Sequence, residues 1–208
     1  DNMSYHLLEA NAFILSMPGV PCIFYPHWKK YGNEIKKMIL ARKAVGVHSE
    51  SAVQDEGDYN GYRATVTGAN GTLILELGNR KSSHAGYTEV ASGAGYSMWV
   101  KPNSPLTPEL TITPKSTTYR TSSMSVTMRA LGKLGESTTI YYTVDGSDPM
   151  SSNTKRTYTG AITIEGTMTL KAYAESIYGK SAVQTHVYTY DPPQELPITI
   201  AFQKPDSW

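Results

Sequence analysis

Hydrophobic residues at the start of the chain recur with helical spacing. Between residues 5 and 17 they lie three or four positions apart, which predicts a helix that Pro18 and Gly19 end. Its apolar positions are Leu7, Leu8, Ala12, Ile14 and Leu15. The same spacing returns after Asn33 and predicts a second helix that ends at Gly46, with Ile35, Met38, Ile39 and Val45 on one face.

Between the two helices lies an apolar run, "VPCIFY", at residues 20–25, which predicts a buried strand. A helix, a buried strand and a helix are typical of a parallel α/β architecture. One such strand needs neighbours on both faces, and we find none in the chain. Cys22, the only cysteine, is expected to be a small buried core residue.

From about Ser49 the hydrophobic period changes to two. "YRATVT" and "TLILEL" flank the turn sequence "GANG", and "GYTEVAS" and "GYSMWVK" are joined by "GAG". This alternation predicts a small antiparallel β domain that ends near Lys101.

A proline-rich stretch at residues 102–110 predicts a linker, and a second β unit follows it. Its short strands are spaced about ten residues apart, which is typical of a β-sandwich. They are "LTITP", "MSVTMRA", "TTIYYTVDG", "AITIEG", "MTLKAYAES" and "VQTHVYTY".

Composition and charge narrow the classes of function. The formal net charge is +1 with no basic stripe, which argues against nucleic acid or anionic membranes as partners. No apolar run reaches the roughly twenty residues that a membrane helix needs. Abundant Tyr, Thr and Ser favour β-rich modules that face solvent.

Residues 5–101 resemble the C-terminal part of the alpha-amylase family of glycoside hydrolases. The resemblance rests on "LLEANAFILSMPGVPCIFYPHWKKYGNEIKKMILARKAVGV", in which a "PG-P-IFY" phrase precedes a final helix. It implies that residues 20–25 form strand eight of a (β/α)₈ barrel and that residues 49–102 form domain C. The first seven strands would then lie upstream of Asp1.

Residues 106–190 resemble the Ig-like or fibronectin-like module at the C-terminus of chitobiases and hexosaminidases, through "IYYTVDGSDP", "TGAITIEGTMTLKAYA" and "GKSAV". Residues 197–208 resemble the first strand of a starch-binding module. The expected fold is therefore mainly β, after one strand–helix unit. The expected domains are residues 1–48 (barrel end), 49–102 (domain C), 103–190 (sandwich) and 191–208 (linker and start of a further module).

The resemblance implies a secreted hydrolase of α-1,4-glucans such as starch and glycogen, acting by a retaining mechanism with two carboxylates. The family's third acidic residue lies in an "NHD" phrase that this chain lacks, and "NMSYHLL" after Asp1 matches the sequence downstream of that phrase. We therefore expect no catalytic residue in this segment, and we expect the segment alone to be inactive.

The expected substrate-binding residues are Tyr25, His27, Trp28 and Tyr31, which directly follow strand eight. Active sites of such barrels lie at the C-terminal ends of the strands. Tyr and Trp rings suit the C–H faces of sugars. The alternatives are that Trp28 and Tyr31 pack between the barrel rim and domain C, and that His27 makes a structural hydrogen bond.

Asp145 and Asp148 in "VDGSDP" could help to bind Ca²⁺, but Asp-Gly and Asp-Pro are also ordinary turn sequences, and we expect no metal here. No cofactor is expected in this segment, while Ca²⁺ stays open for the full-length protein. Tyrosines of the second β unit could line a glycan platform or fill the core. They are Tyr141, Tyr142, Tyr158, Tyr173, Tyr188 and Tyr190.

Two other functions stay open: a non-catalytic carbohydrate-binding or spacer module, and a structural or adhesive Ig-like protein without a link to sugar. The last explains residues 106–190 but not "SMPGVPCIFYPHW". The expected partners are an α-glucan polysaccharide and the remainder of the catalytic barrel. The expected location is extracellular or at the cell surface.

Overall fold

The structure, a computed structural model, describes residues 6–79 and 82–194. The chain divides into two compact units, and each is described by itself. The first comprises Asp1–Leu110, Ala130–Thr139 and Ala174–Ala182, and the second comprises Thr111–Arg129, Ile140–Tyr173 and Val183–Trp208. Asp1 and the predicted start of a starch-binding module at residues 197–208 lie outside the described residues.

Two helices open the first unit: α1 (Leu7–Ser16) and α2 (Tyr25–Val45). The predicted helix before Pro18 is confirmed, whereas α2 begins at Tyr25 rather than near Asn33. The first turn of α2 contains a proline, whose missing N–H costs nothing there because the first N–H groups of a helix have no partner within it. The helix has a kink at Tyr31. Gly46 ends α2 as predicted, with φ 68° and its N–H bonded to the carbonyls of the last turn.

The predicted strand at residues 20–25 is wrong in this structure. Residues 20–24 form neither helix nor strand, and Val20 and Phe24 are 95% and 62% exposed. A buried strand needs hydrogen-bonded neighbours, and no strand within residues 6–79 and 82–194 pairs with this run. Cys22 is exposed for the same reason, which corrects the expectation that it would be buried.

Five antiparallel strands follow the helices in the order β1-β2-β3-β5-β4. They are β1 (Ala52–Asp55), β2 (Gly61–Gly68), β3 (Gly71–Gly78), β4 (Thr88–Ser92) and β5 (Tyr96–Pro102). The predicted hairpin at "GANG" is confirmed, because Thr67 faces Thr72 and Gly68 faces Gly71. The predicted pairing of "GYTEVAS" with "GYSMWVK" is confirmed by the β4–β5 ladder.

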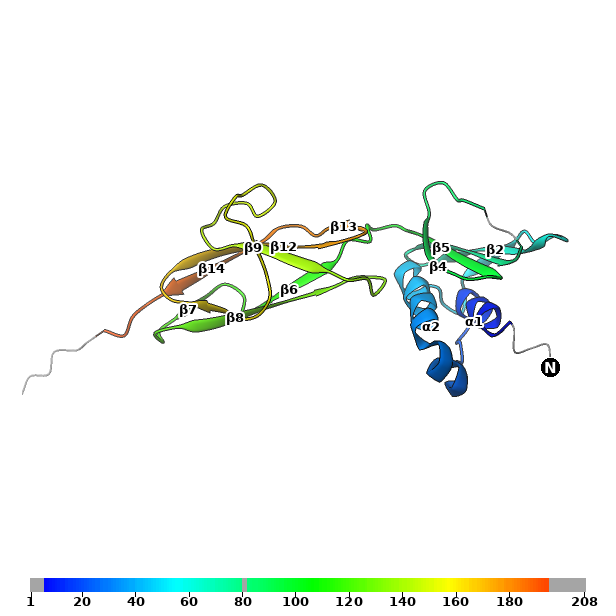
Figure 1. Cartoon of the computed structure of the whole chain (residues 1–208), viewed down its shortest axis with the longest axis horizontal. Coiled ribbons are helices and arrows are strands. Elements are labelled where there is room, and N and C mark those ends of the chain that lie inside the picture. Colours follow the sequence, from blue (N-terminus) through cyan, green and yellow to red (C-terminus); the bar gives the residue numbers. More distant parts are fainter. Residues whose placement is uncertain (1–5, 80–81, 195–208) are drawn as a thin grey trace, which may run out of the picture. The chain divides into compact units, whose positions relative to one another are not determined.

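Both helices pack on one face of this sheet, as Figure 1 shows. Alternate residues of β3 and β5 point toward them, as expected for strands with one covered face. The shared core includes Leu15, Ile35, Met38, Val45, Leu73, Leu75, Met98 and Val100. The opposite face carries the intervening residues, among them Glu76 on β3 and Ser97 and Trp99 on β5.

The second β region forms a six-stranded sheet, with the path β10-β9-β12-β14-β7 and β13 paired with β12, and a three-stranded sheet with the order β11-β8-β6. The predicted strands correspond to β6 (Glu109–Thr113), β8 (Met124–Leu131), β9 (Thr139–Thr143), β11 (Ile162–Ile164), β12 (Met168–Ser176) and β14 (Gln184–Tyr190). Three short strands were not predicted: β7 (Thr117–Tyr119), β10 (Arg156–Thr157) and β13 (Gly179–Lys180). The predicted mainly β fold is thus confirmed.

Candidate functional site

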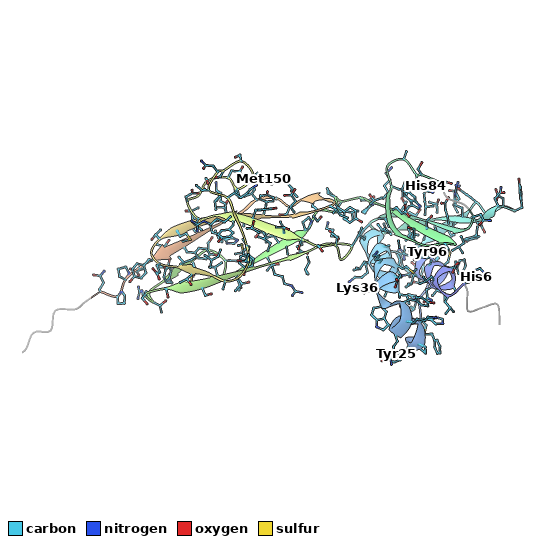
Figure 2. All side chains as sticks on the ribbon, in the orientation of Figure 1. His6, Tyr25, Lys36, His84, Tyr96 and Met150 are labelled. Atoms are coloured by element: carbon cyan, nitrogen blue, oxygen red, sulfur yellow. The ribbon has the colours of Figure 1, made fainter. Side chains whose placement is uncertain are left out.

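The four predicted substrate-binding residues all lie on the first turns of α2, not on a loop after a strand. Tyr25 and Trp28 are 68% and 40% exposed, and they are three positions apart, which places them on one side of the helix. Figure 2 shows Tyr25 at the exposed start of α2. His27 and Tyr31 are half-buried.

His27 is tied to α1. Its Nδ1 lies 3.3 Å from Nδ2 of Asn11, a buried residue whose amide also donates to the Leu7 carbonyl at 2.6 Å. The ring of Phe24 meets the imidazole edge-on, with 5.2 Å between centroids. These contacts give His27 a structural hydrogen bond between the two helices, which was the alternative stated for this residue.

Tyr31 lies at the kink of α2 and packs against the hydrophobic core of the first unit. Lys30 Nζ lies 5.1 Å from the centroid of its ring, and Lys29 Nζ lies 5.8 Å from that of Tyr25. Tyr25 and Trp28 are therefore the two members of the predicted set that present aromatic surface to solvent. An exposed pair of rings beside lysine side chains offers both the apolar face and the hydrogen-bond donors that a sugar ring needs.

Arg42 holds the segment that leads to these residues, and the sequence reading missed it. Its Nη1 donates to the carbonyls of Leu15 and Met17 at 3.1 and 2.6 Å, and its Nη2 donates to that of Gly19 at 2.6 Å. The side chain is buried, and this burial lowers the pKa of Arg42 below its usual value. The signal in the sequence was a charged residue between Met38 and Val45 on the apolar face of α2.

In the second unit, the "VDGSDP" turn is closed by its own side chains. Asp145 accepts from the hydroxyls of Ser147 and Thr154 at 2.5 and 2.7 Å, and the hydrogen bond from Ser147 is the main cause that lowers its pKa to about 2. Asp148 accepts from the backbone N–H of Met150 at 2.9 Å. These contacts are those of turns, and no group of three metal-ligating side chains occurs in the described parts of the chain.

The tyrosines of the second β unit mostly contribute to packing. Tyr173 and Tyr188 are fully buried, and the rings of Tyr141 and Tyr173 lie 5.4 Å apart. Tyr158 accepts the backbone N–H of Met128 at 3.0 Å. The core role, one of the two stated alternatives, accounts for these positions.

Two family profiles match parts of the chain. The profile described as "Glucan 1,4-alpha-maltotetraohydrolase, domain C" matches residues 28–93, which run from α2 into the region after β4. The profile described as "Fn3 associated" matches residues 131–188, within the second β region. In the described part of the chain, no helix is long and apolar enough to cross a membrane.

The chain is also similar to several curated proteins. It is 32% identical over 102 residues to "Probable alpha-amylase 2" of Arabidopsis thaliana, covering 47% of this chain and 25% of that protein. It is 38% identical over 89 residues to "Glucan 1,4-alpha-maltotetraohydrolase" of Stutzerimonas stutzeri, covering 41% of this chain and 16% of that protein. This chain thus spans a quarter or less of the length of these two relatives.

A third relative is shorter. The chain is 33% identical over 105 residues to "Alpha-amylase type B isozyme" of Hordeum vulgare, covering 47% of this chain and 67% of that protein. The resemblance of residues 5–101 to the alpha-amylase family is thereby confirmed, and the domain C profile falls on the helix and sheet that form one core. The chain therefore belongs to the alpha-amylase family, of which it carries the C-terminal domain C region.

Proposed function

We propose that the protein containing this chain is a glycoside hydrolase that acts on α-1,4-glucans such as starch and glycogen. The observation that supports this most is the domain C match at residues 28–93, on a sheet and helix that share a single hydrophobic core. The names of the similar proteins, alpha-amylases and maltotetraohydrolases, point to the same substrate class.

The proposed mechanism is the retaining route, with a nucleophilic carboxylate and a carboxylic acid about 5–5.5 Å apart. Glu76 is the one fully buried carboxylate in the described residues, and it is unsuited to the role of the acid. An acid catalyst needs a raised pKa, whereas the hydrogen bonds that Glu76 accepts hold its pKa below the usual value in spite of burial. As the family resemblance implies, we propose that both catalytic carboxylates lie in a part of the protein outside this chain.

The contribution of this chain would be to complete the barrel and its rim. Tyr25 and Trp28 would contact the glucan, while His27 and Tyr31 fix the first turns of α2 against α1 and the core. Arg42 holds the segment that leads to them. The remainder of the barrel would cover the exposed apolar residues before α2, such as Val20 and Phe24. We also propose an extracellular or cell-surface location, and Ca²⁺ as a ligand of the full-length protein only.

Release of reducing ends from soluble starch tests this function. The full-length protein is expected to release them, and the 208-residue chain alone is expected to release none. In the full-length protein, a Trp28→Ala change is expected to raise KM for starch several-fold. No release by the full-length protein, or release by the 208-residue chain alone, would contradict the proposal.

A carbohydrate-binding or spacer role is the second candidate for residues 103–190. The match to the Fn3-associated profile and the burial of Tyr173 and Tyr188 favour the spacer, since a glycan platform needs exposed rings. Deletion of residues 103–190 from the full-length protein distinguishes a spacer from a carbohydrate-binding module. A spacer can be removed without loss of adsorption to starch granules, whereas a binding module cannot.

A further inference from the structure

A pocket of about 340 Å³ lies at the C-terminal end of α2, within the first unit. Its volume is at the small end of the range for small-molecule sites. One wall is formed by Leu40, Lys43 and Ala44 of α2. The other walls are formed by Asn70 in the β2–β3 turn, by the end of β5 and the chain that follows it, and by Lys133 in the loop after β8. Segments that are distant in the sequence therefore converge on one pocket.

The backbone around this pocket is fixed by hydrogen bonds between these segments. The N–H of Asn70 donates to the Val45 carbonyl at 2.9 Å, and the N–H of Asn103 donates to the Asn70 carbonyl at 2.8 Å. These bonds hold the β2–β3 turn against the end of α2 on one side and against the chain after β5 on the other. A ligand would meet walls that are already in place, so its binding would cost little ordering of the backbone.

The carbonyl groups at the end of α2 are also occupied. Free carbonyls in the last turn of a helix carry partial negative charge and disfavour anions nearby. Here the N–H groups of Gly46 and Val47 donate to the carbonyls of Lys43 and Arg42, both at 3.2 Å. The N–H of Ala69 donates to the Gly46 carbonyl at 3.0 Å. The end of the helix therefore repels an anion less than an uncapped end would.

Two lysines give the pocket its charge. Lys43 and Lys133 line it, and none of its described lining residues is Asp or Glu. Within residues 6–79 and 82–194, neither lysine forms an ion pair with a carboxylate. Lys133 Nζ donates to the Pro105 carbonyl at 2.9 Å, which leaves two of its three N–H groups for a ligand. Two ammonium groups without a carboxylate favour an anionic ligand.

The other lining residues indicate the body of that ligand. The side-chain amides of Asn70 and Asn103 and the hydroxyl of Ser104 can both donate and accept hydrogen bonds. Leu40 and Leu106 add apolar surface. A pocket of this volume suits a molecule larger than inorganic phosphate. The lining therefore fits an anionic group on a small hydroxylated body better than a bare anion.

We propose that this pocket binds a small organic anion, a phosphate ester or a carboxylate whose body carries hydroxyl groups. Lys43 and Lys133 hold the anionic group, and Asn70, Asn103 and Ser104 bind the body. The site is separate from the residues at the start of α2, and binding involves no chemical step. Because the ligand contacts α2, the β2–β3 turn and the loop after β8 together, it would stabilise the first unit by mass action.

Isothermal titration calorimetry of the full-length protein at constant ionic strength tests this site. The probes are glycerol 3-phosphate and glycerate, and we expect at least one of them to bind more tightly than glycerol or inorganic phosphate. Lys43→Gln and Lys133→Gln should each weaken its Kd about fivefold, the upper size for the loss of one exposed charge contact. Ser104→Leu keeps the charge, fills part of the pocket and should weaken the Kd several-fold. Lys37→Gln is the matched control, because it removes the same charge from an exposed lysine of α2 outside the pocket.

The replaced side chains are exposed, so the variants are expected to fold, and thermal melts check this. Binding of glycerol 3-phosphate alone assigns the site to phosphate esters, and binding of glycerate alone assigns it to carboxylates. The site would be overturned if neither probe binds, or if the Kd is equal in the unchanged protein, Lys43→Gln and Lys133→Gln. An equal loss in Lys37→Gln would also overturn it, because net charge would then explain the binding. Inorganic phosphate that binds as tightly as the probes would overturn the organic body of the ligand. The proposed hydrolysis of starch does not depend on any of these results.

Discussion

The buried carboxylate of Glu76 gives a quantitative test of how the first unit is held together. Glu76→Gln keeps the shape of the side chain and removes its charge. The side chain is 0% exposed, and its nearest cation is the Arg63 guanidinium at 3.0 Å. The change leaves Arg63, the backbone N–H of Ser82 and the hydroxyl of Ser97 facing an amide, which accepts hydrogen bonds less well than a carboxylate.

The expected loss follows from how exposed Arg63 remains. Removing one partner of a fully buried ion pair typically costs about 3–5 kcal/mol. Arg63 is 24% exposed and also lies 3.6 Å from Glu56, so solvent and a second carboxylate offset part of this loss. We expect the free energy of unfolding to fall by about 2 kcal/mol.

Glu56→Gln is the matched control, because it removes a carboxylate from the same arginine at a position that is 38% exposed. A pair of this kind contributes ~0.5 kcal/mol. Urea unfolding followed by tryptophan fluorescence, in a Trp208→Phe background, reports on the first unit, since the other two tryptophans, Trp28 and Trp99, both lie in it. With an m value of about 2 kcal/mol/M, Glu76→Gln should lower the midpoint by about 1 M. A shift below about 0.2 M, or an equal shift for Glu56→Gln, would refute the reasoning.

Three further outcomes follow from the same structure. Because the pKa of Glu76 is lower in the folded than in the unfolded state, the ionised carboxylate should stabilise the fold above pH ~4.3, and this stabilisation should be lost as the pH falls through the folded pKa. An acid-unfolding transition that is unchanged in Glu76→Gln would contradict this. Arg42→Lys should lower the free energy of unfolding by about 1–3 kcal/mol, since one ammonium cannot reach three carbonyls, and a thermal melt equal to that of the unchanged chain would argue against it. Gly46→Ala should cost about 1–2 kcal/mol, because φ is 68° and an added Cβ would lie 2.9 Å from Asn70 Nδ2; a urea midpoint that does not move would show that the cap tolerates a side chain.

Features that depend on neighbours in sequence could be predicted. The β2–β3 hairpin followed from alternation on both sides of Asn70-Gly71, and Gly46 marked the end of α2. Six strands of the second β region followed from their regular spacing, whereas the shorter β7, β10 and β13 did not. In each case the local pattern and the packed structure favour the same conformation.

Features that depend on partners distant in the sequence could not be predicted. An apolar run such as residues 20–24 forms a strand only beside other strands, and none in the described residues pairs with it, so Cys22 is exposed as well. Glu76 looked like an ordinary polar position in an alternating strand. Its burial depends on Arg63, Ser82 and Ser97, which come from three other segments.

The candidate site residues were assigned to a local structure that differs from the observed one. Tyr25, His27, Trp28 and Tyr31 were expected after a strand, and they lie on the first turns of a helix, where their spacing separates exposed rings from half-buried ones. Their contact with substrate stays a prediction. The bulge between Glu89 and Ala91 in β4 was not predicted, because no sequence signal marked it.

The most direct measurement of the central claim is the anomeric form of the first product, followed by ¹H NMR while the full-length protein hydrolyses maltoheptaose. A retaining α-glucan hydrolase releases the α-anomer first, and the β-anomer then appears by mutarotation. Early α-anomer is the result that our account predicts. Early β-anomer, or no hydrolysis of this substrate, would contradict it.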